Sequence, residues 1–265
     1  MSDTIERAGR TLERIKSQSP LVHCLTNSVV KNVTANALLA LGAAPAMVED
    51  PVEASEFASI ASALLINVGT LDTFQASSMQ EAVVAANKAG TPWALDPVAV
   101  GPLSVRTQFA QGLLSQKPTL IRGNASEIIA LSGRKSQGRG TDSGDSSEAA
   151  IEAAVSLISK TGGAVLATGP VDCAVDKNQR IACSNGHPLL TRVTGIGCAQ
   201  GAIAAACLAC ADSPFDAAIA AALIVAIAGE IAAERAERPG SFQIAFLDAL
   251  DELTPEVIAK RAKLS

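Results

Sequence analysis

The most informative stretch of this sequence is Val193-Thr194-Gly195-Ile196-Gly197-Cys198-Ala199-Gln200-Gly201, followed by an alanine-rich apolar run from Ala202 to Ala211. Closely spaced glycines before helix-forming residues predict a tight turn that leads into a helix N-terminus. Unpaired backbone N–H groups and the helix dipole stabilise anions in front of such a turn. Cys198 is therefore expected where negative charge is handled. The same glycines are equally consistent with a helix that merely packs closely on a sheet.

Two common phosphate-binding motifs are excluded. The sequence contains no Gly-x-x-x-x-Gly-Lys-Ser/Thr, so a Walker-type loop is unsupported. The spacing of Gly195, Gly197 and Gly201 is one residue too long for a dinucleotide fingerprint, and it lies late in the chain. A Rossmann dehydrogenase is therefore disfavoured.

Composition limits the class of protein further. The 265 residues are 48% hydrophobic and carry a net charge of −5, which argues against nucleic-acid binding. The first 19 residues lack the pattern of a secretory signal, so we expect a cytoplasmic protein. Six scattered cysteines fit reduced thiols, and Cys207 and Cys210 are expected to pack in the core rather than bind a metal.

Two uncharged runs, 195–211 and 217–229, raise the question of membrane insertion. Each is shorter than the roughly 20 apolar residues that a span needs, and both are rich in alanine. We expect buried helices and no membrane contact.

The remaining pattern alternates short apolar runs with helical periods. Strands are predicted at Leu21–Thr26, Leu64–Val68, Pro92–Leu95, Thr119–Ile121 and Ala164–Thr168, helices at Val33–Leu41, Gln75–Ala89 and Glu148–Ser159, and a hairpin at Cys173–Asp176 and Ile181–Ser184. This alternation predicts an α/β fold, a mostly parallel central sheet with helices on both faces. The polar stretch Gly133–Ser147 is expected to be an exposed loop, and residues 1–265 one domain.

Polar residues follow five of the predicted strands, where ligands bind in open parallel sheets. Asp96 and Glu127 suit Mg²⁺, although Asp96 is equally consistent with a turn cap and Glu127 with the first turn of a helix. Arg122 suits phosphate oxygens or a surface salt bridge. Thr168 with Gly169 fits a nucleotide contact or a simple turn.

Six ordered motifs resemble hydroxyethylthiazole kinase, a thiamine-salvage family with the ribokinase-like fold. They are residues 25–36 (LTNSVVKNVTAN), 42–47 (GAAPAM), 65–71 (LINVGTL), 95–101 (LDPVAVG), 121–128 (IRGNASEI) and the glycine turn ending in Cys198. The resemblance runs from about Pro20 through the alanine-rich helix. Ala44 and Ile196 differ from the usual residues, and the loop 138–147 diverges most.

The resemblance implies a three-layer fold without a lid and ATP-dependent phosphorylation of the primary hydroxyl of 4-methyl-5-(2-hydroxyethyl)thiazole. It also implies a homotrimer with active sites between subunits. By motif match, the thiazole contacts are Asn27, Met47 and Gly195, the ATP contacts Arg122 and Thr168, the Mg²⁺ residues Asp96 and Glu127, and the catalytic residue Cys198. Cys198 matches the family's replacement of the aspartate that most ribokinase relatives carry.

Two alternatives stay open at this point. Another ribokinase-like activity, such as a hydroxymethylpyrimidine or pyridoxal kinase, is disfavoured by the segments around Met47 and Cys198. A non-catalytic nucleotide-binding or scaffold protein is disfavoured because Asp96, Arg122, Glu127 and Cys198 are all present.

A helix N-terminus favours a lowered pKa for Cys198, so a thiolate is one possible state of this side chain.

Overall fold

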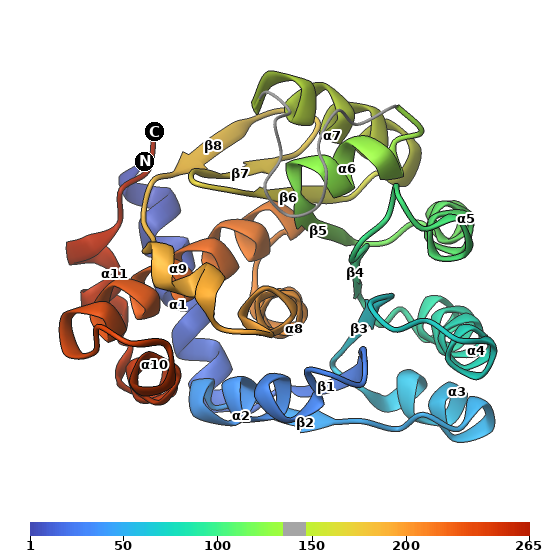
Figure 1. The fold of residues 1–265 in the computed structure, drawn as a ribbon, viewed down its shortest axis with the longest axis horizontal. Helices are drawn as coiled ribbons and strands as arrows, with labels where there is room; N and C mark the ends of the chain where they lie inside the picture. The colour runs from blue at the N-terminus through green and yellow to red at the C-terminus, as the bar shows by residue number, and fades with distance from the viewer. Residues whose placement is uncertain (135–146) are drawn as a thin grey trace.

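The computed structural model describes residues 1–134 and 147–265, and its strands form one eight-stranded sheet in the order β2-β1-β3-β4-β5-β6-β7-β8 (Figure 1). The six strands from β2 to β6 pair in parallel, and β7 and β8 continue the sheet in antiparallel pairing. The strands are β1 Leu21–Leu25, β2 Ala44–Ala46, β3 Ala63–Asn67, β4 Trp93–Asp96, β5 Leu120–Asn124, β6 Ala164–Thr168, β7 Asp172–Val175 and β8 Arg180–Cys183.

Helices cover both faces of this sheet, and each face has its own hydrophobic core. One core is shared by α1 Ser2–Gln18, α2 Lys31–Leu41, α8 Ile196–Cys210, α9 Pro214–Arg235, α10 Pro239–Glu252 and α11 Pro255–Arg261. The opposite face is covered by α3 Pro51–Ile60, α4 Thr73–Ala89, α5 Ser104–Leu113, α6 Ala125–Leu131 and α7 Ser147–Thr161. Short 3-10 turns lie at Leu114–Gln116 and Pro188–Arg192. The predicted three-layer α/β fold is confirmed.

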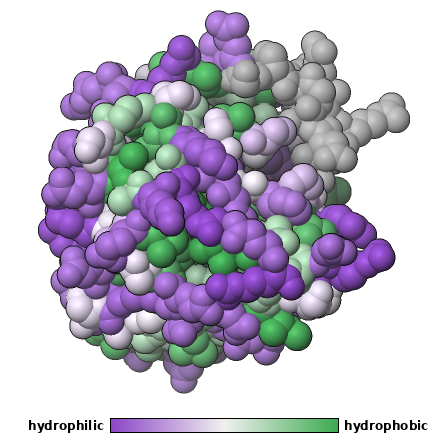
Figure 2. Space-filling model, turned by 90° about the vertical axis from the view of Figure 1, so that its left-hand side faces the viewer, coloured by the Kyte–Doolittle hydropathy of each residue, from purple (hydrophilic) through white to green (hydrophobic). Residues whose placement is uncertain are grey.

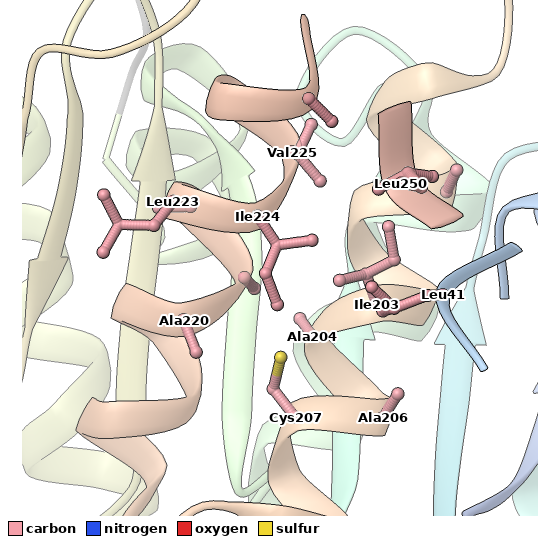
Figure 3. Close-up of a cluster of buried hydrophobic side chains, with 14 of the residues drawn as sticks. Leu41, Ile203, Ala204, Ala206, Cys207, Ala220, Leu223, Ile224, Val225 and Leu250 are labelled. Atoms are coloured by element: carbon pink, nitrogen blue, oxygen red, sulfur yellow. The ribbon is translucent and has the colours of Figure 1, made fainter. Parts of the chain in front are cut away.

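The helices α8 and α9 pack against each other through small side chains (Figure 3). Ala204 and Cys207 of α8 face Ala220 and Ile224 of α9, and all four are fully buried. Alanine brings two helix axes close together, because a methyl group adds little width at the contact. Cys207 and Cys210 are free, buried thiols, as expected for core residues.

The second apolar helix is longer than the sequence runs indicated. Pro214 occupies the first helical turn after the Ser213 cap, and the helix continues to Arg235 through Glu230 and Glu234. Its 22 residues are long and apolar enough to cross a membrane, so the expectation that this run is too short was wrong. However, 94% of the most apolar part of this helix is buried inside the protein. The helix is therefore an interior helix of the fold, as expected.

The predicted strands and the hairpin are confirmed within one residue of their ends, except that β5 continues three residues beyond the predicted end Ile121. The structure adds β2, a three-residue edge strand whose central residue is Pro45. Proline is tolerated there because an edge strand has one side without ladder hydrogen bonds. Helix α7 begins at Ser147 as expected, whereas residues 135–146 of the predicted polar loop lie outside the described residues.

The C-terminal segment protects the other edge of the sheet. Ser265 exchanges backbone hydrogen bonds with Ala182 of β8, and the Ser184 N–H donates to the Lys263 carbonyl. This pairing removes an exposed row of backbone groups from the edge. The face that carries α10, α11 and the chain ends is mainly hydrophilic, with hydrophobic side chains in separate patches (Figure 2).

Candidate active site

A chain of buried amides links the ends of three neighbouring strands to the glycine turn. The Asn27 side-chain amide, just after β1, donates from Nδ2 to Asn67 Oδ1 at 3.0 Å and to Cys198 Sγ at 3.4 Å. Asn67, the last residue of β3, donates from Nδ2 to Asp96 Oδ2 at 2.6 Å. Asn67 and Asp96 are directly opposite each other in the parallel ladder. The strand ends therefore converge, as the sequence predicts.

Asp96 ends β4 in a fully buried position. Its Oδ1 accepts no hydrogen bond, and Arg122 Nη1 lies 3.6 Å away. Burial raises the pKa of Asp96 to about 7, while the charge of Arg122 opposes this rise and that of Glu127 adds to it. A buried oxygen without a donor is costly unless a cation or another partner reaches it. The Asp96 carboxylate is thus buried beside the Arg122 cation, and its Oδ1 is not used as a turn cap.

Arg122 lies within β5, and its side chain is 11% exposed. Its Nε and Nη2 both donate to Gln200 Oε1, at 3.1 and 2.9 Å. Gln200 in turn donates from Nε2 to Asp172 Oδ2 at 3.2 Å. The guanidinium is therefore oriented by α8 and the start of β7, and the alternative of a surface salt bridge was wrong.

The glycine turn serves close packing and site construction together. Gly195 caps α8 with a φ of 94°, a conformation that glycine adopts without steric cost. A Cβ on Gly201 would lie 3.0 Å from Asp96 Oδ2, and one on Gly197 would lie 3.3 Å from Arg122 Nη2. The glycines thus allow the start of α8 to lie directly against the two charged groups of the site. The close-packing interpretation of this turn is confirmed, because the start of α8 packs on the sheet where the polar residues gather. Anion binding at the turn stays a prediction.

Cys198 departs from the expectation for a thiol at a helix N-terminus. Burial and, after it, the charge of Asp96 raise its pKa to about 11, although Asn67, Arg122 and Asn27 act in the opposite direction. Desolvation outweighs the helix dipole here because the thiolate would lie beside another acidic group in an interior of low polarity. At neutral pH the side chain is a neutral thiol, so a thiolate is not its resting state.

Glu127 is tied to the backbone. Its Oε1 accepts from the Ala99 N–H and its Oε2 from the Asn124 N–H, both at 2.9 Å. Asn124 returns the contact by accepting from the Glu127 N–H, which completes a capping box at the start of α6. Glu127 therefore has the role in the first helical turn that the sequence allowed. Its negative charge also raises the pKa of Asp96.

The resemblance implies a magnesium ion, and the side-chain oxygens of Asp96 and Glu127 differ in how well they fit it. In residues 1–134 and 147–265, no three or more His, Cys, Asp or Glu side chains form a metal cage. Asp96 fits the ion, because its buried Oδ1 lacks a hydrogen-bond donor. Glu127 fits less directly, since both its oxygens already accept backbone hydrogen bonds. Such a site suits Mg²⁺ bound by few carboxylates together with phosphate and water.

Met47 and Thr168 lie at the periphery. Met47 follows the edge strand β2, is half-buried and packs against the core of the α8 face. Thr168 ends β6 opposite Asn124, and it is also half-buried. In the part of the chain that the structure describes, no hydrogen bond joins either residue to the cluster of Asn27, Asn67, Asp96, Arg122 and Cys198.

Gln200 and Asp172, which orient Arg122, are not among the predicted site residues. Gln200 was quoted only as part of the glycine turn, although it carries the one amide side chain in the uncharged run 195–211. A lone polar residue at a buried helical position requires a partner, and this was the available signal. Asp172 lies just before the predicted hairpin strand that begins at Cys173, and nothing in the sequence marks it as a neighbour of α8.

Comparisons with known proteins agree with this arrangement. The sequence profile of the Hydroxyethylthiazole kinase family matches residues 12–256. A hydroxyethylthiazole kinase from Serratia proteamaculans is 54% identical over 250 residues, covering 94% of this chain and 95% of the relative. The solved hydroxyethylthiazole kinase structure from Pyrococcus horikoshii is 38% identical, superposes with a TM-score of 0.90, and covers 100% of this chain and 99% of that one.

A pyridoxal kinase structure from Staphylococcus aureus shares the fold alone, at 20% identity and a TM-score of 0.61 over 80% of this chain and 87% of that one. This chain is much more similar to the two hydroxyethylthiazole kinases than to the pyridoxal kinase, both in sequence identity and in the share of the chain that is matched. The sequence and the structure thus show that the chain belongs to the hydroxyethylthiazole kinase family, whose members are phosphotransferases of the ribokinase-like fold.

Proposed function

We propose that this chain transfers the γ-phosphoryl group of ATP to the primary hydroxyl of 4-methyl-5-(2-hydroxyethyl)thiazole, a step of thiamine salvage. The observation that carries the proposal is the hydrogen-bonded chain from Cys198 through Asn27 and Asn67 to Asp96, beside Arg122. One end of this chain presents groups suited to an alcohol, and the other presents groups suited to a phosphate. Membership of the family supports the same assignment.

In the proposed reaction, the alcohol oxygen forms a bond to the γ-phosphorus while the bond from that phosphorus to the ADP oxygen breaks, and the hydroxyl proton passes to an oxygen of the transferred phosphoryl group or to water. Met47, Gly195 and Asn27 would hold the thiazole, and Arg122 and Thr168 the nucleotide. Arg122 and the N–H groups at the start of α8 would stabilise negative charge on the transferred group. A loose transition state needs little early deprotonation of the alcohol, so a neutral Cys198 thiol beside the hydroxyl is compatible with transfer.

We also propose Mg²⁺ as the cofactor, with Asp96 as its principal protein ligand and Glu127 in support. The ion, when bound, would neutralise charge on the phosphate oxygens. The chain's own contribution is to present Asp96 Oδ1, which accepts no hydrogen bond, while Asn67 holds the carboxylate in place through Oδ2.

The Asp96→Asn variant is expected to need about tenfold more Mg²⁺ for half-maximal activity, because a neutral amide is a weaker ligand than a carboxylate. The measurement is a Mg²⁺ titration at fixed ATP, with Asp248→Asn, an exposed change on α10, as the matched control. Identical titration curves for Asp96→Asn and the unmodified protein would remove Asp96 from the metal site.

The remaining parts of the proposal concern assembly. We infer one kinase domain over residues 1–265, located in the cytoplasm, that acts as a homotrimer with each active site completed by a neighbouring subunit. The half-buried position of Met47 at the rim is compatible with closure by a partner. Sedimentation measurements test the trimer.

The function is tested by an ATP-consumption assay with thiazole, pyrimidine and pyridine alcohols. The hydroxyethylthiazole is expected to react with a kcat/KM roughly tenfold or more above that of hydroxymethylpyrimidine, since complementary pockets discriminate to at least this degree. A reversed order would reject the thiazole assignment, and pyridoxal as the best substrate would favour the related kinase. Absence of ATP turnover with every alcohol would favour a non-catalytic protein.

A further inference from the structure

The side chains behind Arg122 form a relay that runs away from the amide chain of the active site. Arg122 of β5 donates two hydrogen bonds to one oxygen of Gln200 on α8. Gln200 donates a hydrogen bond from its amide nitrogen Nε2 to Oδ2 of Asp172 at the start of β7. The Gly169 N–H donates to the other oxygen, Asp172 Oδ1, at 3.0 Å. Three separate parts of the fold therefore converge behind a single guanidinium.

The chemistry of the two neighbours fixes the orientation of the Gln200 amide. A guanidinium has only N–H donors, so the amide oxygen must face Arg122. An ionised carboxylate has only acceptors, so the amide nitrogen must face Asp172. Gln200 is 5% exposed, and solvent therefore offers little competition for these contacts. Few side chains other than an amide present an acceptor to one side and a donor to the other at this length.

The amide also keeps a negative charge at a distance from Arg122. The guanidinium already has Asp96 3.6 Å from Nη1. If a second carboxylate contacted Nε and Nη2, it and Asp96 would together cancel the positive charge of Arg122, and little would remain to attract a phosphate. Gln200 occupies these two donors with a neutral oxygen, so the remaining N–H groups and the charge stay available.

We propose that Gln200 and Asp172 are positioning residues for ATP: they fix the plane of the Arg122 guanidinium through a neutral amide, so that it is oriented without being neutralised. This inference rests on the proposed nucleotide role of Arg122. It adds two residues to the reaction, neither of which touches the substrates. Asp172 also links the relay to the turn after Thr168, because it holds the Gly169 N–H.

The decisive comparison uses two substitutions of Gln200 with similar size and different charge. Gln200→Glu places a carboxylate against the guanidinium and beside Asp172, and we expect it to raise both the KM and the Kd for ATP by about tenfold. Gln200→Met removes the hydrogen bonds but adds no charge, and a rise of about threefold is expected. The KM for the thiazole alcohol should change by less than about twofold in both variants, since the relay does not contact the alcohol side.

The controls separate this role from simple support of the fold. Gln80→Glu, an exposed change of the same charge on α4, should leave both KM values within about twofold. Circular dichroism and thermal melting check folding, and the Kd for ATP is measured by calorimetry without the alcohol. If Gln200→Glu does not fold, Gln200→Met alone tests the relay.

Several outcomes would overturn the inference. These are an ATP Kd for Gln200→Glu equal to that of the unmodified protein, equal effects of Glu and Met, or parallel increases in the KM of both substrates. An unchanged ATP Kd in Gln200→Met would do so as well. If the unmodified protein does not phosphorylate the thiazole alcohol, the proposed function fails, whereas the ATP Kd series still decides whether the relay exists.

Discussion

Replacing Arg122 by alanine is expected to raise the KM for ATP by about 10- to 100-fold and to leave the KM for the thiazole alcohol nearly unchanged. A guanidinium that donates to phosphate contributes roughly 1.5–3 kcal/mol as a charge-assisted hydrogen bond. The position supports this size of effect, because the side chain is only 11% exposed and is held by Gln200 next to Asp96. Water can therefore replace little of the lost interaction.

The measurement is steady-state kinetics with each substrate varied in turn. Arg235→Ala is the matched control, since Arg235 makes a two-contact ion pair with Glu252 on an exposed part of α9 and α10. That variant should retain both KM values within about twofold. Arg122→Lys should fall between the two, because an ammonium keeps the charge but lacks the fork that meets Gln200. An unchanged KM for ATP in Arg122→Ala would show that Arg122 serves only the internal pairing with Asp96 and Gln200.

The layered fold could be predicted because its signals are local. Buried parallel strands appear as apolar runs, and each of the predicted strands Leu21–Thr26, Leu64–Val68 and Ala164–Thr168 overlaps an observed one. The edge strand β2 was missed because Pro45 interrupts its three residues. The uncharged run 217–229 marks only part of α9, because Asp216 bounds that run, although Ser213 caps the helix and Pro214 suits its first turn.

The polar residues at the strand ends of the candidate site were predictable, but the residues behind Arg122 and the pairings within the site were not. Strand ends that share an edge of a parallel sheet must lie together, so Asn27 and Asp96 could be placed from spacing alone. The contact of Arg122 with Gln200 depends on how far α8 is rotated over the sheet, and packing of the whole core sets that rotation. Core packing also determines how deeply Cys198 is buried. The sequence alone therefore could not show that burial raises the Cys198 pKa by more than the helix dipole lowers it.

Replacing Cys198 by alanine is expected to lower kcat by about 10²-fold, the lower end of the range for proton-transfer assistance. The value lies at this end because a loose transition state needs little deprotonation of the alcohol. It also lies there because the Cys198 pKa of about 11 leaves little thiolate to act as a base at neutral pH. The remaining rate would come from Arg122, the backbone N–H groups of the glycine turn and the metal.

Cys198→Asp is expected to retain or raise kcat, because a carboxylate is a better proton acceptor than a neutral thiol. Asn27 Nδ2, which now donates to Cys198 Sγ, is placed to donate to the new oxygen. Cys210→Ala, at the buried far end of the same helix, is the control and should keep kcat within about twofold. The measurement is kcat at saturating ATP and thiazole, with folding checked by circular dichroism. Equal kcat for Cys198 and its alanine variant would show that the side chain only lines the pocket, because the backbone and the metal would then account for the whole rate.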